Sequence, residues 1–406
     1  MLALGLLFAC TTAPAPESVV SPVPEPGVDG TVAPSPGESL AGTGPFGIQL
    51  GDWEGRFATQ GGPLRFRMRV DSGCRTTLMV AGQEIEAFAQ CEANTLSVRF
   101  PPYLGSLTAT IGEGGDTLLG QYDFQRSGEW HHLPFEASRA LEPVWIAPPE
   151  GAPATLSLQV DGKSTVLLET REHEGRTYAS VSAPTGDWGP LEGGWTPEGL
   201  ELSGFDGSHA FLVKLAPDDA GRMVGTVWSR DADGKPLVET EEQADLDGWN
   251  DLDLASVDFT GLSLPRIGGA TEPLPTDRPR IVHLTGSWCP NCNDAAPVIE
   301  ALARDFPEVV VLGLSWEAGA PPGKADRQIQ RFNDRHGVSH AMYRLDAAPP
   351  FLDPVPAWPT TLFVRADGTV QAAHVGFLGP STGTRHTALV ERMRSEAGKL
   401  AGRSGG

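Results

Sequence analysis

The sequence has few basic residues for its length. Its 406 residues include 30 Lys and Arg against 52 Asp and Glu, which gives a formal net charge of −22. This excess of negative charge argues against electrostatic binding to nucleic acid or to an anionic membrane surface, and we expect no nucleic-acid partner. Many of the acidic residues fall between positions 231 and 258, which we interpret as a solvated face or linker. The acidic residues there lack the spacing of an EF-hand calcium loop.

The N-terminus lacks an apolar run long enough to span a membrane. The stretch MLALGLLFAC holds nine apolar residues before its cysteine, which suffices only for a signal peptide, expected at residues 1–9. No Lys or Arg precedes this run. Pro, Ser, Gly and acidic residues dominate residues 10–45, and this composition favours a disordered tether. The alternative is a disordered tail with an incidental cysteine.

The end of the apolar run carries a further signal. The residues Leu7-Phe8-Ala9-Cys10 resemble a bacterial lipobox, which implies that Cys10 is lipidated and becomes the mature N-terminus. The resemblance implies a protein anchored by lipid in the cell envelope, outside the cytosol. Thr11 provides no acidic retention signal, so the periplasmic side of the outer membrane is favoured by analogy.

Cysteine is scarce, with five residues in the chain. With Cys10 lipidated, four remain, and outside the cytosol disulfide pairing is the default. Proximity in sequence suggests that Cys74 pairs with Cys91 and that Cys289 pairs with Cys292, although four cysteines permit three connectivities. We expect the first pair to be structural, joining two neighbouring strands.

Sustained helical periodicity is missing from the first half of the folded region. Short alternating runs such as LRFRMRVD and TLSVRF are separated by Gly-rich turns, the pattern of half-buried antiparallel strands. Residues 105–128 and 207–234 form a weak internal repeat, as do residues 61–71 and 151–161. We therefore predict two β modules, small barrels or sandwiches, at 46–145 and at 146–256, the second including the acidic linker.

The last part of the chain has a different pattern. From residue 257 to 402, strands alternate with amphipathic helices, and a hairpin and a final helix follow. The predicted order is strand 281–286, helix 290–304, strand 308–315, helix 323–337, strands 342–345, 360–365 and 369–375, and helix 383–399. This order indicates an α/β domain with a mixed sheet.

The pair Cys289 and Cys292 lacks the companions of a zinc site. A zinc ribbon needs a second Cys-x-x-Cys or two suitably spaced His, and Gly337 is expected to end a helix between His336 and His340. Instead Cys289 stands between a strand and a helix, where free backbone amides and the helix dipole stabilise a thiolate. Cys292, one turn further along, is placed to act as the resolving thiol. The alternative is a structural disulfide of short range.

Residues around the pair resemble a known family. VHLTGSWCPNCNDAAPVIEAL and PVPAWPTTLFVRADGTVQAAHVGFLGPSTG are similar to the TlpA/ResA-like thiol–disulfide oxidoreductases, which have the thioredoxin fold. The resemblance covers residues 258–400. It implies that Pro359 follows a cis peptide bond and faces the disulfide. It also implies a substrate groove formed by Trp288, Trp358 and Thr360.

Two positions depart from the family pattern. Many relatives carry a Glu three residues after the second cysteine, where this chain has Ala295, and thioredoxins carry a buried Asp where this chain has His283. His283 is a candidate acid or base because His titrates near neutrality, although a core His is an equal alternative. Glu317, after the strand at 308–315, is a second candidate.

These features predict a membrane-anchored oxidoreductase that reduces protein disulfides. Its expected partners are disulfide-bonded protein substrates and, by family resemblance, a membrane thiol reductase as electron donor. We expect neither a metal nor an organic cofactor. The alternative is a lipid-anchored β-domain binding or scaffold protein whose redox domain is vestigial or regulatory.

Overall fold

The computed structural model describes residue 44 and residues 47–100, 105–126, 129–139, 145–230, 232–249, 261–317, 320–346 and 355–403. The signal peptide expected at residues 1–9, Cys10 and nearly all of the tether expected at 10–45 lie outside the described residues. All described residues belong to one compact unit that begins at Leu40. None of the described helices has the length and hydropathy needed to cross a bilayer.

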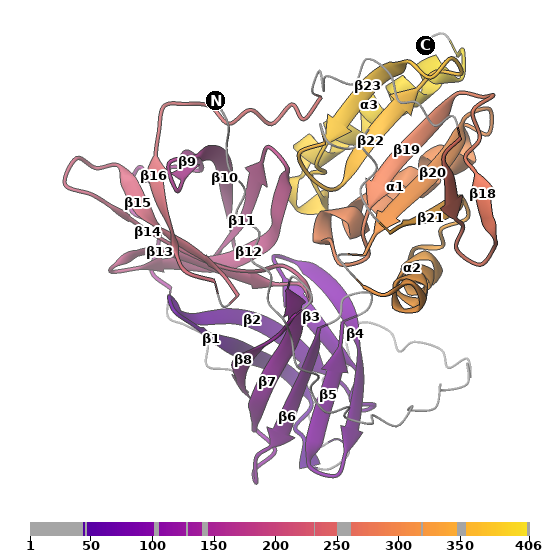
Figure 1. The fold of residues 1–406 in the computed structure, drawn as a ribbon. Helices are drawn as coiled ribbons and strands as arrows, with labels where there is room; N and C mark the ends of the chain where they lie inside the picture. Colours follow the sequence, from indigo (N-terminus) through magenta and orange to yellow (C-terminus); the bar gives the residue numbers. More distant parts are fainter. Residues whose placement is uncertain are drawn as a thin grey trace, which may run out of the picture. The chain divides into compact units, whose positions relative to one another are not determined.

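The first β region is a closed antiparallel barrel of eight strands (Figure 1). Strand β2 illustrates why it forms, because Leu64, Phe66 and Met68 point into the core while the arginines between them are half-buried. The predicted disulfide between Cys74 and Cys91 is confirmed, and the buried Cys74 joins the core. The strands are β1 (Gly51–Thr59), β2 (Gly62–Val70), β3 (Thr76–Val80), β4 (Gln83–Glu92), β5 (Thr95–Arg99), β6 (Ser106–Ile111), β7 (Thr117–Arg126) and β8 (Glu129–Ser138).

The second β region is another closed barrel, in which β16 pairs with β9 to complete the ring. Of the weak internal repeat, residues 105–128 and 207–234 fall on the sixth and seventh strands of the two barrels, whereas residues 61–71 and 151–161 fall on different strands. Duplication therefore stays a prediction. The strands are β9 (Thr155–Val160), β10 (Ser164–His173), β11 (Arg176–Ala183), β12 (Gly186–Thr196), β13 (Gly199–Phe205), β14 (Ala210–Pro217), β15 (Met223–Ser229) and β16 (Lys235–Glu239).

The two barrels share part of one core. Phe205, at the end of β13 in the second barrel, is fully buried among aromatic side chains of the first barrel. Its ring centroid lies 4.8 Å from that of Phe57 and 5.0 Å from that of Phe66. Edge-to-face and tilted aromatic pairs at these separations are favourable beyond the area that they bury. Phe205 thus joins the barrels through the hydrophobic effect.

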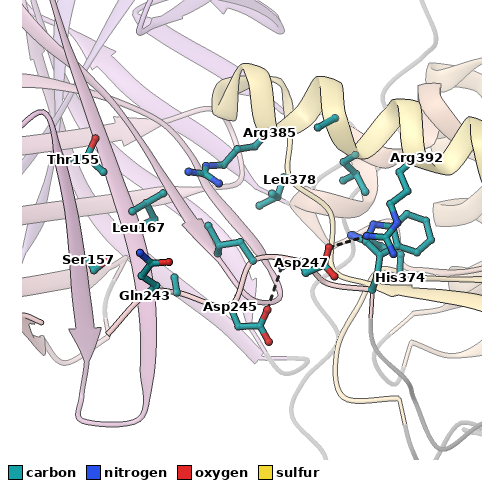
Figure 2. A pocket seen from close by; sticks show the side chains of 15 residues that line it. Thr155, Ser157, Leu167, Gln243, Asp245, Asp247, His374, Leu378, Arg385 and Arg392 are labelled. Atoms are coloured by element: carbon teal, nitrogen blue, oxygen red, sulfur yellow. Dashed lines mark hydrogen bonds and ion pairs between the residues drawn. The ribbon is translucent and has the colours of Figure 1, made fainter. Parts of the chain in front are cut away.

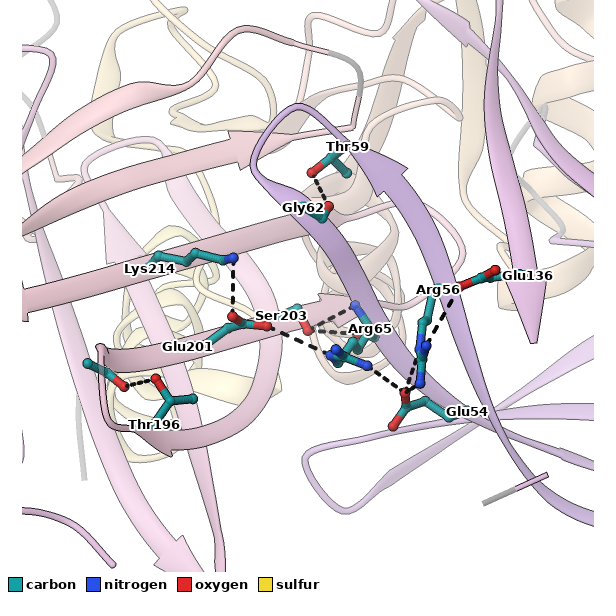
Figure 3. A network of polar contacts seen from close by, with 11 residues as sticks. Glu54, Arg56, Thr59, Gly62, Arg65, Glu136, Thr196, Glu201, Ser203 and Lys214 are labelled. Carbon is teal, nitrogen blue, oxygen red and sulfur yellow. Dashed lines mark hydrogen bonds and ion pairs between the residues drawn. The ribbon is translucent and has the colours of Figure 1, made fainter. Parts of the chain in front are cut away.

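Polar contacts surround this shared core. Arg67 of β2 forms two hydrogen bonds with the buried carboxylate of Glu192, at 2.6 and 2.9 Å. The Ser203 hydroxyl donates to the Arg65 carbonyl and accepts from the Arg65 amide, and the Arg65 guanidinium also faces Glu201 (Figure 3). The bidentate pair fixes the orientation of the Arg67 side chain relative to Glu192, because two nitrogens of the guanidinium must face the carboxylate.

The C-terminal part has the thioredoxin-like arrangement of a mixed sheet with helices. Its five strands are ordered β21-β20-β19-β22-β23, with β19, β20 and β21 parallel and β22 and β23 antiparallel to their neighbours. The elements are β17 (Ser263–Pro265), β18 (Thr271–Pro273), β19 (Arg280–Thr285), α1 (Pro290–Asp305), β20 (Val310–Trp316), α2 (Pro322–His336), β21 (Ala341–Leu345), β22 (Thr360–Val364), β23 (Val370–Val375), the 3₁₀ turn η3 (Pro380–Thr382) and α3 (Thr384–Leu400). Each predicted helix and strand of this part is present within about two residues, whereas the hairpin β17–β18 was not predicted.

The helices cover one face of this sheet. Ile299 of α1 and Met393 of α3 pack with Ile281 and Phe363 of the sheet, and Phe332 of α2 packs with Ala296 of α1. On the other face, Leu264 and Leu274 from the β17–β18 hairpin region cover the central strands. Strand β19 is therefore buried on both faces along its whole length, including the polar residues Arg280, His283 and Thr285. It fixes the position at which α1 begins.

The acidic segment after the second barrel combines exposure with packing. Its carboxylates at positions 241, 242, 245 and 247 are exposed, as a solvated linker requires. Nevertheless Asp247 pairs with Arg392 of α3 at 2.9 Å (Figure 2). The Gly248 carbonyl also accepts from the Val375 amide. The Arg392 guanidinium lies 4.4 Å from the Trp249 ring centroid. This end of the linker is therefore fixed to the thioredoxin-like part.

Replacing Phe205 should destabilise both barrels. Phe205→Ala removes a ring from the shared core, and truncation of a buried Phe costs about 3–5 kcal/mol in free energy of unfolding. Urea titration followed by circular dichroism measures the change. The control is Phe88→Ala, because Phe88 is 72% exposed on the first barrel and a surface substitution changes stability by about 0.5 kcal/mol or less. Equal effects of the two substitutions would contradict the shared core.

Candidate functional site

The two cysteines lie where β19 ends and α1 begins. Cys289 is the N-cap of α1, and Pro290 is the first helical residue, where a missing backbone N–H has no cost. Cys289 and Cys292 form a disulfide with their Cα atoms 5.2 Å apart. The Cys292 amide donates to the Cys289 sulfur at 3.3 Å. The helix start therefore directs an N–H group, and the positive end of its dipole, at the first sulfur.

The two sulfurs differ in accessibility. Cys289 is 5% exposed and Cys292 is completely buried. Cys292 is enclosed because it lies on the face of α1 that packs toward the sheet, next to the buried Ala295 and Ala296. A disulfide or thiol from outside can thus approach Cys289 but not Cys292. This asymmetry separates an attacking thiol from a resolving thiol.

The loop before β22 lies beside the pair. The Trp358–Pro359 peptide bond is cis, in agreement with the family that the sequence resembles. The Trp358 carbonyl oxygen lies 3.7 Å from the Cys289 sulfur. The Thr360 hydroxyl donates to the Ala357 carbonyl at 2.8 Å, and the Pro359 carbonyl accepts from the Gly376 amide at 2.7 Å. These hydrogen bonds hold the loop that places the Trp358 carbonyl beside Cys289.

Aromatic rings form one side of the site. Trp288 is 38% exposed, and its indole N–H donates to the Trp316 carbonyl at 2.8 Å. The Trp316 ring packs edge-on against Trp288 and tilted against Trp358, with ring centroids about 6 Å apart in both pairs. Trp316 was not among the predicted site residues, although it precedes Glu317 in the sequence. The three indoles give the site an apolar rim next to Cys289.

Glu317 supports the loop before the cysteines. Its carboxylate is 4% exposed and accepts from the Ser287 amide at 2.9 Å, the Ser287 hydroxyl at 2.5 Å and the Ser315 hydroxyl at 2.8 Å. A buried carboxylate needs such donors to compensate for lost hydration. Glu317 thereby connects the end of β20 to Ser287, two residues before Cys289. These contacts suit a positioning residue, and its predicted role as an acid or base stays a prediction.

His283 lies in the sheet core. Its Nδ1 is 3.0 Å from the Thr361 hydroxyl, and Nε2 is buried without a hydrogen-bond partner among the described residues. Burial, with a smaller contribution from the charge of His340, lowers the pKa of His283 to about 3. The ring is neutral near pH 7 and is a weak proton acceptor. This environment favours the core interpretation over the acid–base one.

Sequence reasoning missed an amide–imidazole pair behind the helix start. The Asn293 side-chain nitrogen donates to the carbonyl of Cys289 at 2.8 Å and to that of Ser287 at 3.3 Å. Its oxygen lies 2.8 Å from Nε2 of His336, the last residue of α2. Burial, with the charge of Arg335, lowers the pKa of His336 to about 4, so the neutral ring donates to the amide. Gly337 ends α2 as predicted, in the left-handed conformation.

Metal ligands do not converge anywhere in the described ranges. Within them, no group of three or more His, Cys, Asp or Glu side chains is arranged to hold a metal ion. His340, considered above for zinc, instead pairs with Glu300 at 2.9 Å.

Comparisons with known proteins match only part of the chain. No protein-family model matches. The chain is 32% identical over 97 residues to the soluble secreted antigen MPT53 of Mycobacterium tuberculosis and of Mycobacterium bovis, a match that covers 23% of this chain and 50% of the relative. The chain thus spans about half the length of the curated relatives that it matches.

Similar solved structures are also limited to part of the chain. A secreted Mycobacterium tuberculosis disulfide oxidoreductase homologous to E. coli DsbE has 21% identity, with 34% of this chain and 96% of that chain covered and a TM-score of 0.28. A thioredoxin-family thiol:disulfide interchange protein of Chlorobium tepidum has 13% identity, coverage of 34% and 92%, and a TM-score of 0.27. The thioredoxin domain of a Bacteroides vulgatus thiol–disulfide oxidoreductase has 14% identity, coverage of 34% and 98%, and a TM-score of 0.27. About a third of this chain is therefore similar to thiol–disulfide oxidoreductases of the thioredoxin fold.

Proposed function

We propose that this protein is an extracytoplasmic thiol–disulfide oxidoreductase, anchored through lipid on Cys10, that reduces disulfides in proteins. One observation supports this more than any other. The Cys289 sulfur accepts a hydrogen bond from the Cys292 amide at the start of α1 and faces the cis-Pro359 loop. Cys289 is the more exposed of the two cysteines, and Cys292 is completely buried. A disulfide that served only as a structural brace would not require this combination.

The exchange begins with the reduced pair. The Cys289 thiolate attacks one sulfur of a substrate disulfide, so that one S–S bond forms, another breaks, and a substrate thiolate leaves and takes a proton from water. Cys292 then loses a proton to water and attacks the Cys289 sulfur, which releases the second substrate thiolate. Two electrons pass to the substrate, and the Cys289–Cys292 disulfide remains. Each cycle therefore needs a thiol donor, for which we propose a membrane thiol reductase.

The surrounding residues prepare these steps. The helix start stabilises the Cys289 thiolate, which is the attacking group of the first step. Glu317 and Asn293 fix the backbone at Ser287 and Cys289, so that the sulfur keeps its position relative to the Trp358 carbonyl. The rim of Trp288, Trp316 and Trp358 supplies apolar surface on which a substrate chain can lie. Neither a metal nor an organic cofactor takes part in this mechanism.

A binding function of the β region remains the second proposal. The second barrel has a cavity at one end, lined in part by Val166, Trp188, Phe211 and Arg230, and the rings of Trp188 and Phe211 stack there with centroids 5.2 Å apart. A concave, largely apolar surface with a few charged groups is typical of ligand sites. Partner capture in a pull-down that persists in the full chain with both cysteines of the pair replaced by Ser would favour this function.

Removal of the resolving thiol should trap substrates. In Cys292→Ser, the mixed disulfide at Cys289 has no internal thiol to release it, so covalent complexes accumulate and reduction of insulin falls on the order of 100-fold or more. Non-reducing electrophoresis and mass spectrometry identify the complexes. The matched control is Cys289→Ser, which should trap none because the remaining sulfur is buried. Absence of any trapped partner, together with absence of reductase activity in the unaltered protein, would refute the proposed function.

Replacement of Glu317 should distinguish positioning from proton transfer. Glu317→Gln loses charge-assisted hydrogen bonds to Ser287 and Ser315, which should lower the free energy of unfolding by about 1–3 kcal/mol. We expect the rate of disulfide reduction to fall by the same factor at every pH, because the substitution displaces Cys289 without removing a proton carrier.

Glu300→Gln provides the matched control for this variant. Glu300, which lies in the second half of α1 and well after Cys292, likewise accepts from the amide and the hydroxyl of a serine, Ser339, but this serine does not adjoin the cysteines as Ser287 does. This control should lose stability and keep its rate. If Glu317→Gln instead removed one limb of the pH–rate profile, the carboxylate would be an acid or base in the reaction.

A further inference from the structure

The turn between β11 and β12 of the second barrel lies against the residues that surround the cysteine pair. A Cβ built on Gly186 would overlap the side-chain nitrogen of Asn291, the residue that follows Pro290 between the two cysteines, and would lie 3.1 Å from the Phe377 carbonyl oxygen. A Cβ on Gly376 would lie 2.6 Å from the carbonyl oxygen of Thr185. Both glycines also have positive φ angles, of 138° and 78°. The barrel backbone thus approaches the redox site as closely as two glycines permit.

This contact reaches the loop that carries Pro359. The Gly376 amide, against which Thr185 packs, donates to the Pro359 carbonyl at 2.7 Å. Asn291 is half-buried, and its side-chain oxygen is enclosed without a hydrogen-bond partner among the described residues. The turn therefore covers the side of the site formed by Asn291, Gly376 and Phe377.

Asp187 fixes the turn in this place. Its carboxylate is 5% exposed and accepts from the Gly379 amide at 2.5 Å, the Gly189 amide at 2.7 Å and the Ser381 hydroxyl at 3.3 Å. Gly379 and Ser381 belong to the segment between β23 and α3, whereas Gly189 belongs to the barrel. Hydrogen bonds to a buried carboxylate are stronger than neutral ones. The ion pair of Arg385 with Glu169, at 2.9 Å, adds a second connection between α3 and the barrel.

The charges around Asp187 are compatible with a closed contact. Burial and the negative charge of Asp187 raise the pKa of Asp294, on α1, to about 7. Burial opposes a charge on His209, but Asp206, 2.7 Å away, raises the pKa of His209 to about 9, with help from Asp187 and Asp294. Near neutral pH the positive charge of His209 thus offsets the negative charges of Asp187 and Asp206, and the partly protonated Asp294 adds less negative charge.

Among the described residues, the tryptophan side of the site stays partly open. Trp288 is 38% exposed there, next to Trp316 and Trp358. Access to the Cys289 sulfur is therefore from the tryptophan rim. A folded protein presents a disulfide on a broad surface, which would meet the barrel turn, whereas an extended chain or a small molecule can enter from one side.

We propose that the segment Thr185–Asp187, where the turn after β11 leads into β12, determines substrate specificity by closing one side of the redox site, so that the protein reduces disulfides in extended or unfolded segments. The proposal rests on the proposed oxidoreductase function and adds a substrate class to it. The exchange chemistry is unchanged, since the turn contributes no reacting group.

Displacement of the turn tests this proposal. Gly186→Ala places a methyl group on Asn291 and should move the barrel away from the site. Pre-reduced protein, freed of the reductant, is reacted once with each of two probes: the small disulfide 5,5′-dithiobis(2-nitrobenzoate), and native ribonuclease A as a folded disulfide protein. We expect the variant to react with ribonuclease A about tenfold faster than the unaltered protein, because a larger fraction of its molecules has the barrel displaced from the redox site. The rate with the small probe should change by about twofold or less, because the small probe does not need this displacement.

Gly175→Ala is the matched control. Gly175 lies in the turn at the other end of β11, has φ of 73°, and has open space where a Cβ would stand. This variant should leave both rates unchanged. Asp187→Asn, which removes the charge that fixes the turn, should act in the same direction as Gly186→Ala and replaces it if that variant does not fold.

The outcomes separate the two proposals. If the ratio of the two rates were the same in the unaltered protein, Gly186→Ala and Asp187→Asn, the turn would not determine specificity, and the oxidoreductase function would stand. If the unaltered, reduced protein failed to react with the small disulfide, the oxidoreductase function itself would be refuted.

Discussion

The hydrogen bond from the Cys292 amide to the Cys289 sulfur is the interaction on which the redox site depends. It exists only if α1 begins at Cys289, and the buried strand β19 places that point at the end of the sheet. Glu317 holds the backbone two residues earlier, and Asn293 holds the Cys289 carbonyl from within the first turn. The cis-Pro loop then completes the surroundings of the sulfur. Each part would be of little use to sulfur chemistry without the helix start that it fixes.

Much of the α/β part follows from local sequence. Strand β19 and helix α1 are predicted by a largely apolar segment that precedes Cys-Pro, because Pro favours the first helical turn and apolar residues on both faces suit a buried strand. The pairing of Cys74 with Cys91 follows from their proximity in an alternating β pattern. Such features depend on neighbours within a few turns or strands, which the sequence displays directly.

Other features depend on contacts between distant residues. The Asn293–His336 pair joins positions on two helices, and Trp316 meets Trp288 only after β20 and β19 pair in parallel. In the sequence, Phe205 is one of several apolar residues of the second β module, yet in the structure it belongs to the core of the first barrel. A single sequence shows the periodicity of each helix and strand, but it does not show which distant residues come into contact. Glu317 was identified from its place after a strand, whereas its partners came only from the structure.

The site has its carboxylate one position away from the place that the family resemblance suggests. Ala295, at the position of the expected Glu, is fully buried among Ile281, Ile299 and Phe363, so an ionised side chain there would lose its hydration in an apolar core. This chain has its carboxylate one residue earlier, at Asp294, on the helix face that Asn291 shares and that the second barrel covers. Because Asp187 and His209 of the barrel influence its protonation, the electrostatics at the start of α1 depend on a domain outside the thioredoxin-like part. The barrels and the redox site are thus electrostatically coupled through the same turn that brings them into contact.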